Sequence, residues 1–392
     1  MCWVVWGVGK QLQVMVGVVE TDGTDGAIDR SDGSNVPPST FPCVVERRVG
    51  FATGVVGPDH LRDVHVVGVD GGEEEGVEVS FPVDFRGWVS DWDDLEAVYR
   101  HAFSSLPPPF PSLPSPLCSV IIPVPFILSP MRSKIETLML KTFGFARVAT
   151  HPRPLLALYN HGCMSGVVID MGEVRTVITP VIKGMVVSAA RKTVPVNGRD
   201  ITRRLHRLIS HPEVDLRVAK DIRDTRCFVS HHDSDQPAEE DSAGASAGVD
   251  DEYVLPGLDG EPGEILSLGS WLHEAPECLF SPPLIGYDAY GLAEALVASI
   301  DESVRHHTEG GDVRKMMYKR IVVVGTTANL PNLSARLESE IRRIHKPRPT
   351  PTVSKIRIRR SSVFQGAALL GEIMRASTGT DDDDDDPFWT TC

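Results

Sequence analysis

The stretch GVVIDMGEVRTVITPVIKG, residues 166–184, carries the pattern on which the predicted fold rests. Three apolar residues run directly into Asp170, a small-residue turn follows, and residues 176–182 form a second strand. A strand that ends on a carboxylate delivers that acid to the mouth of a site. The stretch therefore predicts a β-hairpin with an acidic turn.

The turn of this hairpin has the residue types of an anion site. Gly172 has no Cβ, so backbone N–H groups of the turn can face an anion. A carboxylate beside such a turn can hold Mg²⁺ through water. The pattern is short, and a buried hairpin with a surface Asp-x-Gly turn is the simpler interpretation.

The composition limits the class of protein. The 392 residues suffice for two or more domains or one two-lobed body, and 41% hydrophobic residues support a sizeable core. A formal net charge of −15 argues against general binding to nucleic acid or anionic membranes. The seven cysteines are scattered without Cys-x-x-Cys spacing, which predicts a reducing compartment and neither a disulfide framework nor a zinc site.

The apolar start of the chain, MCWVVWGVGKQLQVMVGVVE, is predicted to be a β-hairpin over residues 3–19. It differs from a signal peptide because it lacks a basic leading region and is interrupted by glycine, lysine and glutamine. No other segment is long and apolar enough to span a bilayer. We therefore expect a soluble, intracellular protein without membrane insertion.

Periodicity predicts further helices and strands along the chain. The clearest early helix is SDWDDLEAVYRHAFS, whose acidic first turn suits the helix dipole. Helices are expected at residues 90–104, 129–143, 153–160, 198–210, 213–227, 291–306 and 332–344. Strands are expected at residues 41–48, 64–69, 77–81, 118–122, 265–268, 321–324 and 355–360. Residues 362–375 are expected to contain a turn at Gly366 and Ala367 and then a helix.

Three polar or proline-rich segments separate or follow these elements. Residues 106–125 carry eight prolines and predict a tethering loop, with a polyproline ligand as the alternative. Residues 230–252 are acidic and rich in Ser, Ala and Gly, which predicts a mobile insert. The six aspartates of residues 381–386 and the ending PFWTTC predict a mobile tail. A docking peptide anchored by Phe388 and Trp389 is the alternative.

An ordered series of segments resembles actins. VVWGVGKQ, VIDMGEV and VVVGTTANLP each combine a strand with a small-residue turn, and such segments can surround a nucleotide. The chain is similar to actins, in the same order, in DWDDLEAVYRHAF, in FGFARV through GVVIDMGE, and in GRDIT, AKDIRDTRCFV, ECLFSPPLIG, IVVVGTTANLPNLSARLESEI and SVFQGAALLGEI. The resemblance covers residues 41–373 and identifies a divergent actin-related protein.

The resemblance implies an α/β, two-lobed fold of the actin/Hsp70/hexokinase superfamily. Each lobe would be a five-stranded mixed sheet flanked by helices, with a nucleotide cleft between the lobes. The small lobe would comprise residues 1–159 and 362–392, with an outer subdomain at about 43–81. The large lobe would comprise residues 160–361, with an outer subdomain at about 197–286 that carries the acidic insert.

The resemblance also implies a site for ATP or ADP with Mg²⁺. The matching contact positions are Asp170, Gly172, Glu173, Gly198, Lys220, Arg223, Asp224, Thr327 and Arg360, and Asp170 is also the candidate metal ligand. The same charged residues can instead be ordinary salt-bridged helix faces. Static retention of a nucleotide and its complete absence both remain open.

The departures from the actin pattern remove the chemistry of hydrolysis. Trp6 stands where actins place an aspartate, which removes a carboxylate that would organise water around Mg²⁺. Val174 replaces a glycine at the phosphate-facing turn. Arg153 and Val177 stand where actins use Gln and His to place and relay the attacking water, and neither can act as a base. We therefore expect no catalytic residue and no actin-type hydrolysis.

The predicted function is that of a non-catalytic structural subunit in a cytoplasmic, cytoskeletal assembly, either dynactin-like or ciliary and axonemal. Its partners would be protein subunits, actin or other actin-related proteins among them. A nuclear chromatin-remodelling subunit and a polymerising ATPase are the alternatives. In LFSPPLIG, Leu284 and Ile285 are candidate contacts or buried residues. The basic run 342–360 is interpreted as a solvated edge and not as a nucleic-acid site.

Overall fold

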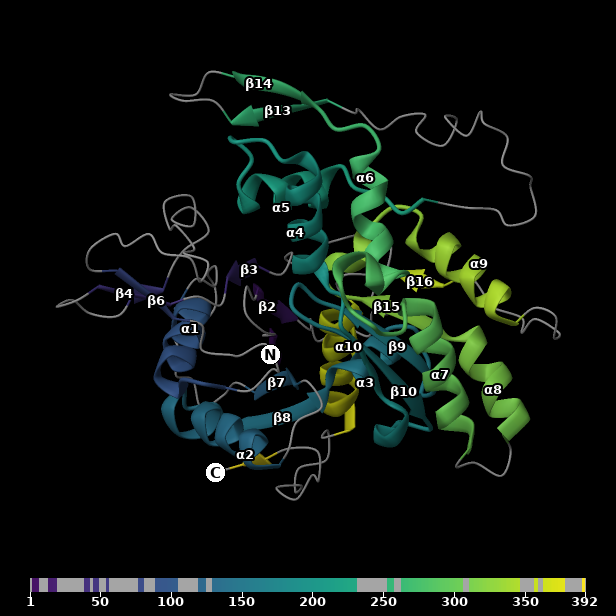
Figure 1. The fold of residues 1–392 in the computed structure, drawn as a ribbon. Helices are drawn as coiled ribbons and strands as arrows, with labels where there is room; N and C mark the ends of the chain where they lie inside the picture. The colour runs from purple at the N-terminus through teal and green to yellow at the C-terminus, as the bar shows by residue number, and fades with distance from the viewer. Residues whose placement is uncertain are drawn as a thin grey trace. The chain divides into compact units, whose positions relative to one another are not determined.

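The structure is a computed structural model that divides into two compact units. Unit 1 comprises Met1–Gly162 and Ser362–Cys392, and unit 2 comprises Cys163–Ser361. Their elements are labelled in Figure 1. The structure describes residues 2–6, 13–19, 39–42, 45–48, 54–55, 77–80, 89–104, 119–124, 129–230, 252–256, 262–305, 310–345, 356–358, 362–377 and 390–391.

Unit 1 is built on a mixed sheet with the strand order β17-β8-β7-β1-β2-β3. The strands are β1 (Cys2–Trp6), β2 (Gln13–Val19), β3 (Ser39–Pro42), β7 (Ser119–Val124), β8 (Arg147–Pro152) and β17 (Thr390–Thr391). β1 and β2 pair antiparallel, which confirms the predicted opening hairpin. The described sheet has six strands instead of the expected five, because the end of the chain adds β17 at its edge.

A second, smaller sheet of unit 1 contains β4 (Val45–Arg48), β5 (Gly54–Val55) and β6 (Val77–Ser80). The single strand predicted at residues 41–48 is therefore wrong, since β3 and β4 belong to different sheets. β3 ends at Pro42, which has no backbone N–H with which to continue a ladder. The strand predicted at residues 64–69 lies outside the described residues, as does most of the proline-rich stretch.

The helices of unit 1 are α1 (Trp92–Ser104), α2 (Ser129–Thr137), α3 (Arg153–Tyr159) and α10 (Ser362–Ser377), and α2 continues as a π-helical turn over Leu138–Thr142. The carboxylate of Asp91 accepts from the N–H groups of Asp93 and Asp94 at 2.9 and 3.0 Å, so it caps α1. Phe103 contacts Phe143 and Phe145 edge-on in the core of this unit.

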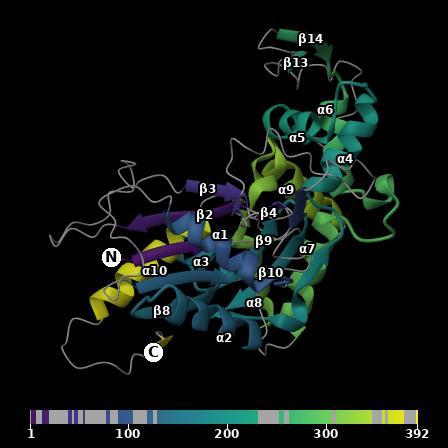
Figure 2. The ribbon, with the colours of Figure 1, turned by 90° about the vertical axis from the view of Figure 1, so that its left-hand side faces the viewer.

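The turn predicted at Gly366 and Ala367 is wrong, because α10 runs without interruption through both residues. α10 packs against α3 and lies along β1 and β2 (Figure 2). A Cβ atom added at Gly366 would collide with the carbonyl oxygen of Leu156 on α3. The small residue therefore serves the close approach of two helices and not a turn.

His151 on β8 gives unit 1 an acid-sensitive element. Burial, followed by the charge of Arg132, lowers its pKa from 6.5 to about 4. Between these two pH values the unfolded chain binds a proton at His151 and the folded chain does not. The neutral, buried His151 therefore stabilises the fold fully above pH 6.5, and this stability is lost as the pH falls towards 4.

We expect wild-type protein to lose about 2 kcal/mol more stability between pH 7 and pH 5 than the His151→Gln variant loses. Urea unfolding of both proteins at the two pH values measures this difference. Equal losses in the two proteins would show that His151 is not held neutral by the fold.

Unit 2 is built on a sheet with the order β11-β10-β9-β15-β16, and β12 also pairs with β10. The strands are β9 (Gly166–Met171), β10 (Thr176–Ile182), β11 (Met185–Val186), β12 (Lys192–Val194), β15 (Ile321–Val324) and β16 (Arg357–Ile358). The antiparallel pair β9–β10 confirms the central hairpin. The described sheet again has six strands, because β11 and β12 pair with different parts of β10.

Helices surround this sheet, and a hairpin lies outside it. The helices are α4 (Gly198–Ile209), α5 (Leu216–Thr225), α6 (Trp271–Glu274), α7 (Leu292–Arg305), α8 (Gly310–Lys319) and α9 (Leu333–His345). Short 3₁₀ turns are η3 (Ser188–Ala190), η6 (Ala275–Leu279), η7 (Pro282–Ile285) and η8 (Thr326–Asn329). β13 (Glu252–Pro256) and β14 (Pro262–Ser267) form the hairpin. The sequence did not predict α8 or β13.

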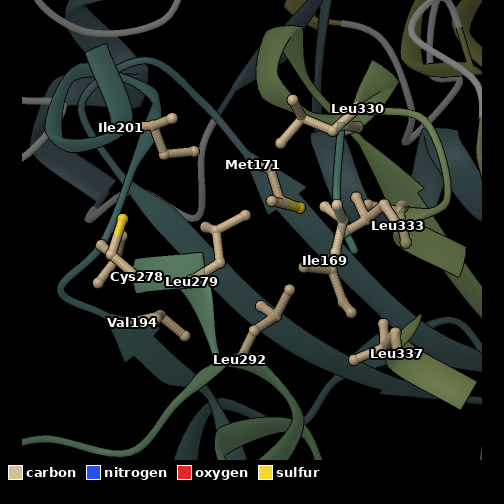
Figure 3. Packing of buried hydrophobic residues seen from close by; sticks show 14 of the residues in the cluster. Ile169, Met171, Val194, Ile201, Cys278, Leu279, Leu292, Leu330, Leu333 and Leu337 are labelled. Atoms are coloured by element: carbon tan, nitrogen blue, oxygen red, sulfur yellow. The ribbon is translucent and has the colours of Figure 1, made fainter. Parts of the chain in front are cut away.

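The core of unit 2 supports the end of β9. Figure 3 shows Ile169 and Met171 of β9 among Leu279 of η6 and Leu330 and Leu333, which flank the start of α9. Both β9 side chains are fully buried. Each such side chain contributes about 1.5–3 kcal/mol when it leaves water, so the strand that carries Asp170 is firmly held. Within the described residues, no helix has the length and apolarity that crossing a membrane requires.

Candidate functional site

The candidate site lies within unit 2, at the turn after β9. Asp170 on β9 lies opposite Val177 on β10. The N–H of Gly172 donates to the carbonyl oxygen of Arg175 at 2.9 Å. This N–H therefore closes its own turn and is already satisfied, so it is not available to an anion.

The carbonyl oxygen of Gly172 ties the same turn to α4 and to η8. The carbonyl oxygen of Gly172 accepts from the N–H of Gly198 and from the hydroxyl of Thr327, both at 3.2 Å. Thr327 is buried. The structure thus brings these two predicted contact residues to the turn, where they bond to protein backbone.

Glu173, the next acid of the turn, forms a buried ion pair with Arg223 of α5. Nη1 of Arg223 lies 2.9 Å from Oε1 of Glu173, and Nη2 lies 2.9 Å from Oε2. The side chains are 2% exposed for Arg223 and 8% for Glu173. Two parallel charge-assisted hydrogen bonds of this kind are strong and directional, and here water is largely excluded.

The remaining donors of Arg223 are also engaged. Nη1 donates to the carbonyl oxygen of Gly198 at 2.6 Å and to the hydroxyl of Thr202 at 2.8 Å, and Nε donates to Asp224 at 2.8 Å. Burial lowers the pKa of Arg223, but the charges and hydrogen bonds of Glu173 and then Asp224 outweigh it, so the pKa is raised above its ordinary value. The guanidinium is therefore a fixed, internally neutralised cation.

Gly198 allows α4 to close over this ion pair. Asn197 caps the helix, its side chain accepting from the N–H of Asp200 in a reciprocal capping box. A Cβ atom at Gly198 would lie 2.8 Å from both Nη1 of Arg223 and Oε2 of Glu173. Only glycine lets the first turn of α4 approach the pair so closely.

Lys220 lies on α5 like Arg223, but its ion pair is exposed to solvent. Its Nζ lies 3.0 Å from Asp224, and the two side chains are 41% and 42% exposed. The predicted alternative of an ordinary salt-bridged helix face describes this pair well. Arg360, the last predicted contact residue, lies outside the described residues, as does most of the acidic insert.

Asp170, the candidate metal ligand, lies near two arginines. Asp170, Val177 and Thr193 are cross-strand neighbours on one face of the sheet, and Arg175 and Arg191 directly precede β10 and β12. Burial lowers the pKa of Arg191, the charge of Arg175 lowers it further, and Asp170 opposes both. The positive charge of these arginines therefore exceeds the negative charge of Asp170.

The surroundings of Asp170 do not fit a divalent cation. The two guanidinium groups near the single carboxylate of Asp170 repel a divalent cation. Within the described residues, no group of three or more His, Cys, Asp or Glu is placed to hold a metal ion. Arg175 and Arg191 were not among the residues predicted from the sequence, because their placement near Asp170 depends on how the strands pair.

Neither of the two positions matched to the water-placing residues of actins carries a base. Arg153 begins α3 in unit 1 and is 3% exposed, and Val177 on β10 in unit 2 is 5% exposed. Trp6 ends β1. None of these side chains accepts a proton at neutral pH.

Comparison with known proteins identifies the family. The family model of actin matches residues 33–217 and 214–378. This chain belongs to the actin family. It is a divergent actin-related chain: actin-related protein 2 of Caenorhabditis briggsae is 29% identical over 383 residues, which cover 92% of this chain and 89% of that protein. Actin-related protein 2 of Drosophila melanogaster is 29% identical over 384 residues, covering 91% and 89%.

A third relative from the actin family agrees with these two. Actin-related protein 2 of Saccharomyces cerevisiae is 30% identical over 365 residues, which cover 87% of this chain and 88% of that protein. The resemblance found in the sequence and the two-lobed α/β actin-like fold are therefore confirmed.

Actin-family proteins generally bind ATP or ADP with Mg²⁺, and four of the residues matched to nucleotide contacts are already engaged within the protein. Glu173, Gly198, Arg223 and Thr327 are buried and already bonded to one another or to the turn. A ligand hydroxyl or phosphate would have to break these bonds and leave a buried charge uncompensated, which costs several kcal/mol. These residues thus form a closed polar cluster instead of an open set of ligand contacts.

Proposed function

We propose that this actin-family chain is a non-catalytic structural subunit of a larger cytoskeletal assembly and that it works without bound nucleotide. The observation that carries the proposal is the buried Glu173–Arg223 pair, which occupies the residues matched to nucleotide contacts. The lack of a base at Arg153 and Val177 supports it independently, because an attacking water would have no group to accept its proton.

Units 1 and 2 would be the small and large lobes of the family fold, with boundaries near residues 160 and 361. The acidic insert would belong to the outer subdomain of the large lobe. The partners would be protein subunits, actin or other actin-related proteins among them, in a dynactin-like or ciliary and axonemal complex of the cytoplasm. Leu284 is about half exposed on η7 and is the candidate contact in LFSPPLIG.

Purified full-length protein should show no ATP turnover above background and no salt-induced polymers. The physical reason is the loss of water-activating side chains together with a turn whose donors and charges are already satisfied. Phosphate release and pelleting assays, with actin run in parallel as the positive control, measure both properties. A burst of phosphate on assembly would instead support the alternative of a polymerising ATPase.

Native pull-down from separated cell fractions tests the assembly itself. Recovery with other cytoskeletal subunits from the cytoplasmic fraction is the expected result. Recovery with chromatin-remodelling subunits from the nuclear fraction would replace the proposed assembly with the nuclear alternative. Recovery as a free monomer from both fractions would contradict the role of a structural subunit.

A further inference from the structure

The end of the chain returns to unit 1 as an edge strand. β17 pairs antiparallel with β8, with Thr390 opposite Val148 and Thr391 opposite Arg147. In the strand order of this sheet, β17 stands last and β8 next to it, and Figure 1 shows the chain end beside β8. Without β17, β8 would therefore be the edge of the sheet. An open edge presents unpaired N–H and C=O groups that can pair with another strand.

β8 is held by the core of unit 1, whereas β17 is held chiefly by β8. Val148 and Ala149 are buried, and the hydroxyl of Thr150 donates to Glu136 of α2 at 2.8 Å. β8 also pairs along its length with β7. β17 has only two residues, and Thr391 is exposed. Loss of β17 should leave β8 in place with its outer edge open.

The segment that supplies β17 also supplies much of the net charge. Residues 381–392 contain six aspartates and no other charged side chain, so their removal changes the formal net charge from −15 to −9. Like net charge keeps copies of a protein apart, and its effect weakens as salt is added. The strand and the charge of this segment can therefore be changed separately.

We propose that β17 is a protective edge strand and that a second copy of this chain pairs through β8 when β17 is removed. The second copy is the fitting occupant because two antiparallel β8 strands present the same edge to each other around a two-fold axis. Val148 and Thr150, which are β-branched, favour the extended conformation that such pairing needs. The outer edge of β8 would then be a dimer interface that β17 covers in the full chain.

Two variants separate the strand from the charge. A chain that ends at Asp386 loses β17 but keeps its formal net charge, because PFWTTC carries no charged side chain. The matched control keeps β17 and changes residues 381–386 from aspartate to asparagine. Sedimentation velocity over a concentration series measures self-association, and hydrogen exchange measures the protection of the β8 amides. Both measurements are made on the full chain as well.

We expect the chain that ends at Asp386 to associate at least about 10-fold more tightly than the full chain and to associate more tightly still at high salt. At low concentration, where it is monomeric, the amide of Arg147 or Val148 that faces β17 should exchange faster, while the β8 amides that face β7 and those of β7 keep their protection. The asparagine control should stay as monomeric as the full chain.

Two results would overturn the proposal. Unchanged exchange at β8 in the shortened chain would show that β17 does not cover this edge. Faster exchange at β8 without any gain in association would show that the uncovered edge does not pair with a second copy.

Discussion

Replacing Arg223 with methionine should lower the free energy of unfolding by about 3–5 kcal/mol. The substitution keeps much of the side-chain volume but leaves the carboxylate of Glu173, which is 8% exposed, without its partner. It also removes the donor for the carbonyl oxygen of Gly198 and the hydroxyl of Thr202. A buried charge that loses its partner keeps the full cost of desolvation, which is why the effect is large.

The matched control is Lys220→Met on the same helix. Lys220 pairs with Asp224 in an exposed i,i+4 salt bridge, so its loss should cost less than about 0.5 kcal/mol. Urea unfolding followed by far-UV circular dichroism measures both variants. Similar small losses in the two would show that Arg223 is no more than a surface cation and would remove the main support for a closed cluster.

Replacing Gly366 with alanine should destabilise unit 1 by about 3 kcal/mol, at the upper end of the usual cost of overpacking. The added Cβ would meet the carbonyl oxygen of Leu156, which is backbone and cannot swing aside, so α3 and α10 must move apart. Helix propensity alone would predict the opposite sign, because alanine is favoured over glycine inside a helix by about 1 kcal/mol.

Gly311→Ala is the control for this helix contact. Gly311 lies in the first turn of α8, and a Cβ atom there would have nothing within 4 Å. Alanine should therefore be neutral or stabilising by up to about 1 kcal/mol. Thermal unfolding distinguishes the two variants by the opposite directions of their shifts. A rise in melting temperature for Gly366→Ala would show that α3 and α10 are not in close contact.

Patterns with a clear period and clear ends allowed most of the fold to be predicted. The central hairpin, the opening hairpin and α1 each combine regular apolar spacing with a turn or cap that marks their ends. Gly366 shows the limit of this reasoning. A glycine beside an alanine indicates a turn by local rules, but its role here depends on Leu156, a residue more than two hundred positions earlier.

The candidate site could be predicted only in part, for a related reason. The family resemblance led to Glu173, Gly198 and Arg223, and the structure does bring them together. Sequence alone gave their charges but not their partners, so open ligand contacts and a closed ion pair were equally compatible with it. Arg175 and Arg191 were missed because their placement beside Asp170 depends on the register of three strands.

The most direct test of the account is the thermal stability of the full chain with saturating ATP and Mg²⁺, compared with the same protein in EDTA. A ligand present at about 100 times its Kd adds about 2.7 kcal/mol to the folded state, which a melting curve resolves easily. The account predicts identical curves, because Arg223 already neutralises Glu173 and two arginines accompany Asp170. A clear upward shift with ATP and Mg²⁺ that EDTA reverses would contradict it.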